Sequence, residues 1–117
     1  MCRRQAFGSG GRSLADLEAL SVQIDRTGQV SRLEVAGELD IATVPDLEGA
    51  FEQVRSEHPQ TILIDLSQVT FIDSTGVRLL LLMTERCDGA LRMVLSPQVD
   101  RVVEITGIRP SLPVVQE

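Results

Sequence analysis

The chain has 117 residues, of which 43% are hydrophobic and 24% charged, so it is long enough to form one domain with a buried core and is not expected to be disordered throughout. Its formal net charge of −6 argues against nucleic acid and against an anionic membrane as partners, because both bind basic surfaces. A protein partner fits this charge better.

The first segment, MCRRQAFGSGGRS, is rich in glycine and serine and shows no apolar periodicity. It lacks the apolar centre of a signal peptide, and no later stretch reaches the roughly 18 uninterrupted apolar residues of a membrane span. Cys2 and Cys87 are too far apart to suggest a CxxC pair or a disulfide framework, so a location in the reducing cytoplasm is expected. We predict a flexible and dispensable tail over residues 1–13 and one domain over residues 14–117.

The domain begins with two segments in which apolar and polar residues alternate, as in half-buried strands. Residues 20–25 form the first of these segments, and residues 31–36 form the second. The sequence DRTGQ between them contains a glycine suited to a turn. A β-hairpin is therefore predicted.

After GELDI the period changes, and apolar residues recur at every third or fourth position: Val44, Leu47, Phe51 and Val54. Thr43 and Asp46 have the spacing of a capping box, and a proline lies in the first turn, so an amphipathic helix is predicted up to the sequence SEHPQ. TILIDL, residues 61–66, is short and nearly all apolar, which indicates a fully buried strand.

The stretch FIDSTGVRLLLL places Ser74 at a strand-to-helix turn, with a leucine-rich helix predicted over residues 77–86 and ended by CDG. ALRMVLS is the next strand, and Ser96 with Pro97 starts a third helix that ends at Gly107. LPVV is a candidate last strand. The order β-β-α-β-α-β-α-β predicts a single α/β domain, with helices packed on a mostly parallel sheet that is opened by the hairpin.

Catalytic and metal-binding motifs are missing from this sequence. The only histidine, His58, precedes Pro59 and is expected to be a solvated loop residue. No P-loop, G-x-S-x-G or G-x-G-x-x-G motif is present, and Ser74 has no candidate base. We expect no enzymatic activity, no cofactor and no metal.

The polar insert IDSTG has two interpretations, which are compatible with each other. Asp73 or Ser74 could cap the following helix by accepting a hydrogen bond from its first turn. Alternatively, a hydroxyl at this turn is accessible to a kinase, and a phosphate there would meet the helix N-terminus on one side and Asp73 on the other. Thr75 is the alternative phosphoacceptor.

Three ordered segments, VAGELDIATVPDL, ILIDLSQVTFIDSTGVRLLL and LSPQVDRVVEITGI, resemble the STAS domain, specifically the bacterial anti-sigma factor antagonists, over about residues 16–115. The resemblance implies that Ser74 is phosphorylated by the partner anti-sigma factor, a serine kinase of the histidine-kinase-like ATPase fold. It also implies that Asp40 and Asp73 are acidic neighbours of that serine, that the unphosphorylated protein binds the anti-sigma factor and frees the sigma factor, and that a separate serine phosphatase reverses the switch. Family members usually continue into another helix after the last strand, whereas this sequence ends at Glu117.

The helix over residues 77–86 is also expected to contribute to the partner surface, because its apolar residues spread beyond one stripe and at least one should stay exposed. The predicted switch-site and partner-binding residues are Asp40, Asp73, Thr75, Gly76, Val77 and Leu79. A monomer is expected. The rival functions are a STAS subunit of a lipid ABC transport complex that docks its ATPase, and a phospho-relay scaffold.

Overall fold

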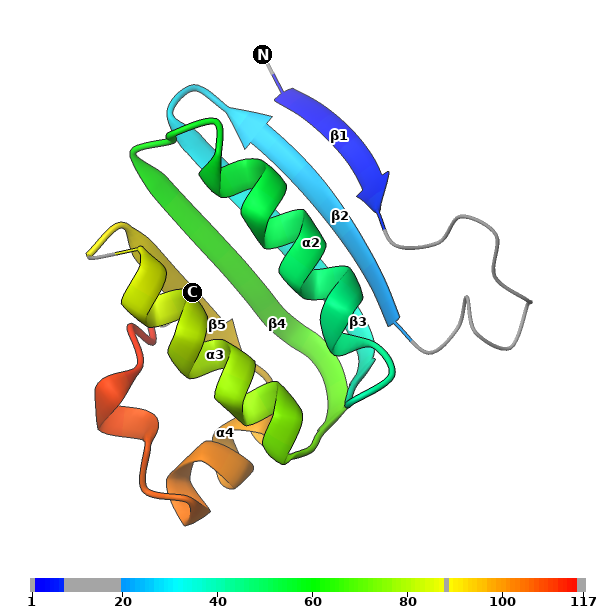
Figure 1. The fold of residues 1–117 in the computed structure, drawn as a ribbon, viewed down its shortest axis with the longest axis vertical. Helices are drawn as coiled ribbons and strands as arrows, with labels where there is room; N and C mark the ends of the chain where they lie inside the picture. Colours follow the sequence, from blue (N-terminus) through cyan, green and yellow to red (C-terminus); the bar gives the residue numbers. More distant parts are fainter. Residues whose placement is uncertain (1, 8–19, 88, 116–117) are drawn as a thin grey trace.

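The computed structural model describes residues 2–7, 20–87 and 89–115, and for residues 2–7 it describes the backbone only (Figure 1). The elements in chain order are β1 (Cys2–Phe7), β2 (Leu20–Thr27), β3 (Val30–Leu39), α2 (Val44–Arg55), β4 (Thr61–Ile72), α3 (Ser74–Arg86), β5 (Leu91–Leu95), α4 (Pro97–Ile105) and the short 3-10 helix η1 (Arg109–Ser111). This order confirms the predicted α/β fold, with every predicted helix present.

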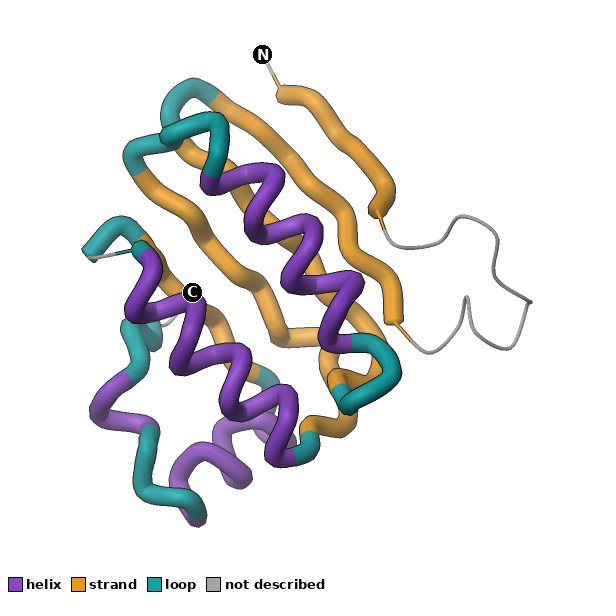
Figure 2. The backbone as a smooth tube through the Cα atoms, viewed as in Figure 1, coloured by secondary structure: helices purple, strands orange, loops and turns teal. Residues whose placement is uncertain are grey.

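The strands form one sheet in the order β1-β2-β3-β4-β5. Pairing is antiparallel between β1 and β2 and between β2 and β3, and parallel from β3 through β4 to β5. The predicted hairpin is therefore the β2–β3 pair, and the sheet is mixed, since parallel pairing is confined to its second half. Helices α2 and α3 lie side by side over one face of the sheet (Figures 1 and 2).

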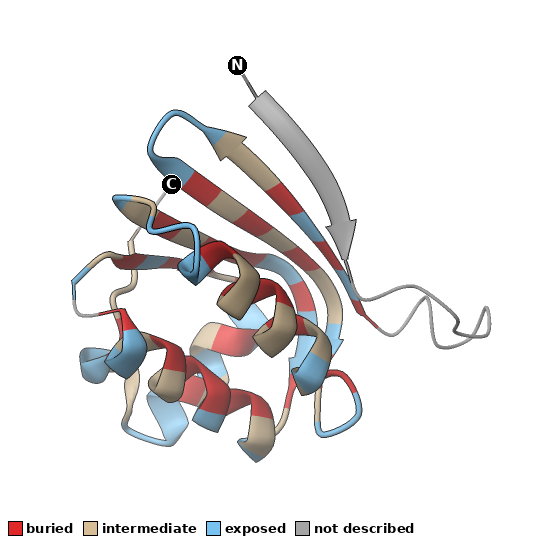
Figure 3. Ribbon diagram, turned by 45° about the horizontal axis from the view of Figure 1, so that its top comes forward, coloured by how far each residue is buried: buried red, intermediate tan, exposed pale blue. Residues whose placement is uncertain are grey.

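The core lies between this face of the sheet and the helices. Along β2, buried and exposed residues alternate, as the sequence pattern predicted (Figure 3). The largest side chains with almost no exposed surface are Phe51, Ile24, Leu33, Leu39, Leu47, Ile62, Ile64, Leu66, Leu80, Met83, Leu91 and Met93. Because β3 and β4 run parallel through this core, Leu39 and Ile72 pair at their carboxyl ends and the loops that follow meet at one edge.

The structure differs from the sequence prediction at the N-terminus. Cys2–Phe7, part of the expected flexible tail, forms β1 and pairs antiparallel with β2 from Cys2 opposite Thr27 to Phe7 opposite Val22. A strand at the edge of a sheet needs backbone pairing but no apolar alternation, and charged residues such as Arg3 and Arg4 are common there. The rest of the predicted tail, apart from residues 2–7, lies outside the described residues.

Two predicted details of the secondary structure need correction. Thr43 occupies the N-cap position of α2, but no side-chain capping bond forms. Its hydroxyl oxygen instead accepts from the Asp40 N–H at 2.9 Å, and the hydroxyl donates to the Glu38 carbonyl at 2.8 Å. The last strand is reduced to one bridge, in which Val114 pairs parallel to Met93. In that bridge the Met93 N–H donates to the Pro113 carbonyl at 2.9 Å.

Candidate functional site

The structure shows which residue of the segment Asp73–Thr75 caps α3 and which hydroxyl stays unbonded. Asp73 is the N-cap residue with an extended backbone, and its Oδ1 accepts a hydrogen bond from the Gly76 N–H at 3.0 Å. Ser74 is the first residue of the helix and is exposed. Its hydroxyl makes no hydrogen bond with any other described residue. The cap is therefore Asp73, which leaves the Ser74 hydroxyl free for chemistry.

Asp73 also joins the helix to the loop after β3. Its Oδ2 accepts a hydrogen bond from the Ile41 N–H at 3.3 Å, and its own N–H donates to the Leu39 carbonyl at 3.2 Å. The loop that carries Ile41 and the start of α3 at Ser74 thus lie next to each other, although they are far apart in the sequence. The Asp73 carboxylate holds the two together.

Asp40 shapes the β3–α2 loop from within. Its Oδ1 accepts from the Ala42 N–H at 3.0 Å and from the Thr43 N–H at 3.2 Å. The Asp40 N–H in turn donates to the Thr43 hydroxyl at 2.9 Å. The carboxylate therefore serves the local turn, and its negative charge lies in the loop next to Asp73.

Gly76 brings α3 close to the ends of β3 and β4. A Cβ at this position would lie 2.7 Å from Ile72 Cγ1 and 2.9 Å from the Leu39 carbonyl oxygen. Both distances are below the contact distance of real Cβ atoms, and one of the two neighbours is a backbone atom. Glycine is thus required so that the helix can start directly beside the strand ends.

Two large apolar side chains are exposed on this edge of the molecule. Ile41, on the loop that Asp73 holds, is 74% exposed, and Phe71, at the end of β4, is 49% exposed. Most apolar side chains of this size are buried elsewhere in the described chain. We use the name switch surface for these two residues together with Ser74 and the exposed stripe of α3, in which Arg78 is exposed and Leu81 and Leu82 are half-buried.

That exposed stripe differs from the one that the sequence predicted. Leu79 is 2% exposed and Val77 is 8% exposed, and Gly76 is also buried, so none of the three offers a side chain to a partner. The expected exposed apolar residue of α3 is not found: Leu81 and Leu82 are only half-buried, and Leu81 packs against the core. The reason is that α3 packs its Val77, Leu79, Leu80 and Met83 side into the core.

Three residues of this region were not among the predicted site residues: Ile41, Phe71 and Arg78. Phe71 could have been found from strand alternation, because it lies next to the buried Ile72 and so faces the opposite way. Arg78 follows Ser74 by four residues, a spacing that places both on one helix face. Ile41 is brought to the site by the fold and leaves no local signal. Thr75, the alternative phosphoacceptor, is half-buried, whereas Ser74 is exposed.

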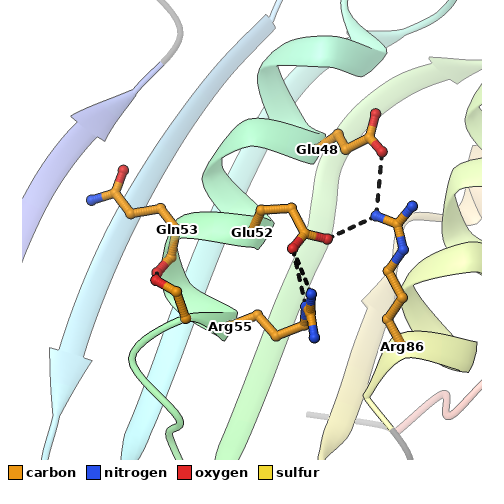
Figure 4. A network of polar contacts seen from close by, with 6 residues as sticks. Glu48, Glu52, Gln53, Arg55 and Arg86 are labelled. Atoms are coloured by element: carbon orange, nitrogen blue, oxygen red, sulfur yellow. Dashed lines mark hydrogen bonds and ion pairs between the residues drawn. The ribbon is translucent and has the colours of Figure 1, made fainter.

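The opposite end of α3 is fixed to α2 by a network of charged side chains (Figure 4). Arg86 Nη1 donates to Glu52 Oε2 at 2.7 Å and to Glu48 Oε2 at 3.3 Å, and Arg55 Nη2 donates to Glu52 Oε1 at 2.9 Å. The hydrogen bond from Arg55, aided by Arg86, lowers the pKa of Glu52 below its ordinary value. These groups hold the two helices of one layer together at the surface.

The described residues contain no group of three or more histidine, cysteine, aspartate or glutamate side chains arranged to hold a metal ion. No helix in the described part of the chain combines the length and apolar character needed to cross a bilayer. Cys87 is buried, and burial raises the pKa of its thiol.

Known proteins resemble this chain along most of its length. A family model described as "Mlab, STAS domain" matches residues 22–113. The anti-sigma-B factor antagonist of Staphylococcus aureus is 31% identical over 94 residues, which are 77% of this chain and 87% of that protein. The protein of the same name from Staphylococcus epidermidis is 31% identical over 81 residues, which are 66% of this chain and 75% of that protein.

Solved structures agree with these sequence relatives. The crystal structure of an anti-sigma factor antagonist from Mycobacterium paratuberculosis has a TM-score of 0.78 and 28% identity, covering 86% of this chain and 88% of that chain. The structure of the anti-sigma factor antagonist SpoIIAA in its unphosphorylated form has a TM-score of 0.63 and 24% identity, covering 82% of this chain and 89% of that chain. The second similarity supports the fold alone.

Proposed function

Because the chain belongs to the STAS domain family, we propose that it is an anti-sigma factor antagonist whose binding to a kinase-type anti-sigma factor is switched by phosphorylation of Ser74. The single observation that carries this proposal is the free, exposed Ser74 hydroxyl beside a helix cap that another residue already supplies. In the unphosphorylated form the chain binds the anti-sigma factor and releases the sigma factor. The site of action is the cytoplasm.

The covalent step needs nothing from this chain except a reachable hydroxyl. The anti-sigma factor transfers the γ-phosphoryl group of ATP to Ser74 Oγ, the hydroxyl proton is released, and ADP leaves. A separate serine phosphatase hydrolyses the phosphoester and restores the hydroxyl. The position of Ser74 at the first residue of α3 favours it over Thr75, which is half-buried.

The phosphate would act on binding through its charge. A phosphoserine carries about −1.5 to −2 charges. Two unit charges ~5 Å apart at an effective dielectric constant of ~20 interact by about 3 kcal/mol before salt screening. Even half of this repulsion against an acidic group of the partner changes affinity about tenfold. Asp73 and Asp40 add negative charge at the same edge, and the phosphate would also hydrate the exposed side chain of Ile41, whose backbone N–H is bonded to Asp73.

The direct test is incubation of the chain with its cognate anti-sigma factor and ATP, followed by mass-spectrometric mapping of the phosphate. We expect phosphate on Ser74, no labelling of Ser74→Ala, and binding by Ser74→Ala that ATP no longer reverses. Ser74→Asp should fold normally and bind weakly. Phosphate on Thr75 would move the switch by one residue. The absence of phosphate from both hydroxyls, together with normal binding by Ser74→Asp, would reject the proposal.

A second candidate function is suggested by the words "Mlab, STAS domain" in the matching family description. It is a STAS subunit of a lipid ABC transport complex, which would use the switch surface to dock an ATPase without a phosphorylation cycle. A pull-down from the native host with and without nucleotide separates the two functions. Recovery of an anti-sigma factor kinase supports the first, and recovery of a transport ATPase with its permease supports the second.

A further inference from the structure

The exposed stripe of α3 carries one arginine whose charge is not balanced within the described residues. Arg78 is exposed and makes no hydrogen bond or ion pair with any other residue that the structure describes. Arg86, the other arginine of α3, differs because Glu48 and Glu52 both accept hydrogen bonds from it. A surface arginine without such a partner can form an ion pair with a negative group that is added to the chain by modification.

Arg78 lies four residues after Ser74 within the continuous helix Ser74–Arg86. Residues at this spacing are neighbours on a helix surface, with Cβ atoms about 5–6 Å apart. The order also matters, because an anion at the first position and a cation four residues later is the favourable orientation. Both side chains are exposed, so the long arginine side chain can reach Ser74 Oγ across solvent without displacing any core residue.

We infer that Arg78 is the intramolecular counter-ion of phosphorylated Ser74, and this inference rests on the phosphorylation proposed above. A guanidinium group matches the geometry of a phosphate and donates two parallel, charge-assisted hydrogen bonds to it. The unmodified chain has no anion at Ser74, which explains why Arg78 is exposed and unbalanced in the structure.

The helix N-terminus alone is a poor partner for this phosphate. Asp73 Oδ1 already accepts a hydrogen bond from the Gly76 N–H, and the Asp73 carboxylate would repel a phosphate on the adjacent residue. A cation one turn along the helix offsets that repulsion. Capture of Arg78 also removes a positive side chain from the surface offered to the partner, so phosphorylation changes the switch surface at two residues.

The test requires phosphoserine at position 74 without any kinase, introduced by semisynthesis or by genetic encoding. The second pKa of the phosphate, ordinarily about 6, is then measured by 31P NMR titration at low ionic strength in the parent chain and in three variants. Arg78→Gln removes the cation and Arg78→Lys keeps the charge without the planar group. Arg92→Gln is the matched control, because Arg92 is also exposed but hydrogen-bonds only to backbone carbonyls, those of Gly89 and Leu91.

A nearby cation stabilises the dianionic phosphate, so Arg78→Gln should raise the second pKa of the phosphate by about 0.3, the effect of an exposed ion pair at this helix spacing. Arg78→Lys should restore most of this difference, and Arg92→Gln should leave the pKa unchanged. The carboxylates of Asp40 and Asp73 are present in every variant, so their effect on the pKa of the phosphate cancels in the comparison. Circular dichroism checks that each variant is folded.

Equal phosphate pKa values in the parent chain and in Arg78→Gln would overturn the inference, as would an equal change in Arg92→Gln, which would indicate an effect of net charge alone. Because the phosphoserine is installed chemically, these outcomes do not depend on whether a kinase modifies Ser74. Failure of kinase labelling, together with normal binding by Ser74→Asp, would reject the proposed function and leave this measurement unaffected.

Discussion

At the scale of single residues, the cap and the switch are carried by different side chains, and their substitution should have different effects. Asp73→Ala removes the acceptor of the Gly76 N–H and of the Ile41 N–H, so it should lower the free energy of unfolding by about 1 kcal/mol. Ser74→Ala should leave it nearly unchanged, because the serine hydroxyl makes no described hydrogen bond. Urea unfolding of the two variants measures both values. If Ser74→Ala lowered the free energy of unfolding more than Asp73→Ala, Ser74 and not Asp73 would be the cap of α3.

At Gly76, the direction in which substitution by alanine changes the stability tests the close packing of α3 against the strand ends. In an exposed helix, Gly→Ala usually stabilises by about 0.5–1 kcal/mol because it restricts the unfolded chain. Here the added Cβ would collide with the Leu39 carbonyl oxygen and with Ile72, so Gly76→Ala should destabilise by about 1–3 kcal/mol. Thermal unfolding of the variant decides, and an unchanged or raised melting temperature would mean that α3 can move away from the strand ends at little cost.

At the scale of elements, the β3–β4 pair carries an ion pair that makes stability depend on pH. Burial by itself would raise the pKa of Asp65, but hydrogen bonds from Ser67 and the ion pair with Arg32 outweigh it and keep the pKa below its ordinary value. A carboxyl group whose pKa is lowered in the folded state stabilises the fold above its unfolded pKa, and this contribution is lost as the pH falls through the folded pKa.

The unfolding free energy of the parent chain should therefore fall more steeply than that of Asp65→Asn as the pH falls below the ordinary aspartate pKa of about 4. At neutral pH the difference between the two chains should be constant. Urea titrations at several pH values provide the comparison. Equal slopes in the two chains would show that other carboxylates cause the acid sensitivity.

Also at this scale, the elements show what the sequence could and could not predict. The hairpin, α2 and α4 were predictable because their apolar residues recur with the period of a strand or a helix. The first half of β4 and the helix α3 were predictable because apolar residues dominate them, whereas η1 was not predicted. The start of α3 is three residues earlier than the predicted position 77, since polar Ser74 and Thr75 carry no apolar signal within the first turn. The strand β1 was missed because edge pairing is made by backbone groups and needs no side-chain pattern.

The candidate site was predictable only in part, for a different reason. Ser74 and Asp73 are adjacent in sequence and form a recognisable motif, so local chemistry identified them. Ile41 reaches the site through a hydrogen bond to Asp73, a contact between residues 32 positions apart that no local pattern encodes. Leu79 was assigned to the partner surface because a leucine-rich helix does not reveal which leucines face the core.

At the scale of the whole molecule, the pairing of β1 at the sheet edge leads us to expect that the N-terminal segment, which the sequence predicted to be dispensable, contributes to stability. The pairing of β1 covers β2 along six residue pairs, so deletion of residues 1–7 should expose that edge. We expect a lower melting temperature and a greater tendency to aggregate, since an unpaired edge strand can pair with another chain. Differential scanning calorimetry and light scattering measure both. Unchanged values after deletion would show that β1 adds no stability.

The switch proposed for Ser74 is most directly tested by the affinity of the cognate anti-sigma factor for the chain with serine and with phosphoserine at position 74, measured by calorimetry without ATP. The account predicts at least about a tenfold weaker affinity for the phosphorylated chain, because the added charge lies beside Asp73 and the exposed apolar side chains of the switch surface. Circular dichroism should show the same fold for both chains. Equal affinities for the two forms would contradict the account.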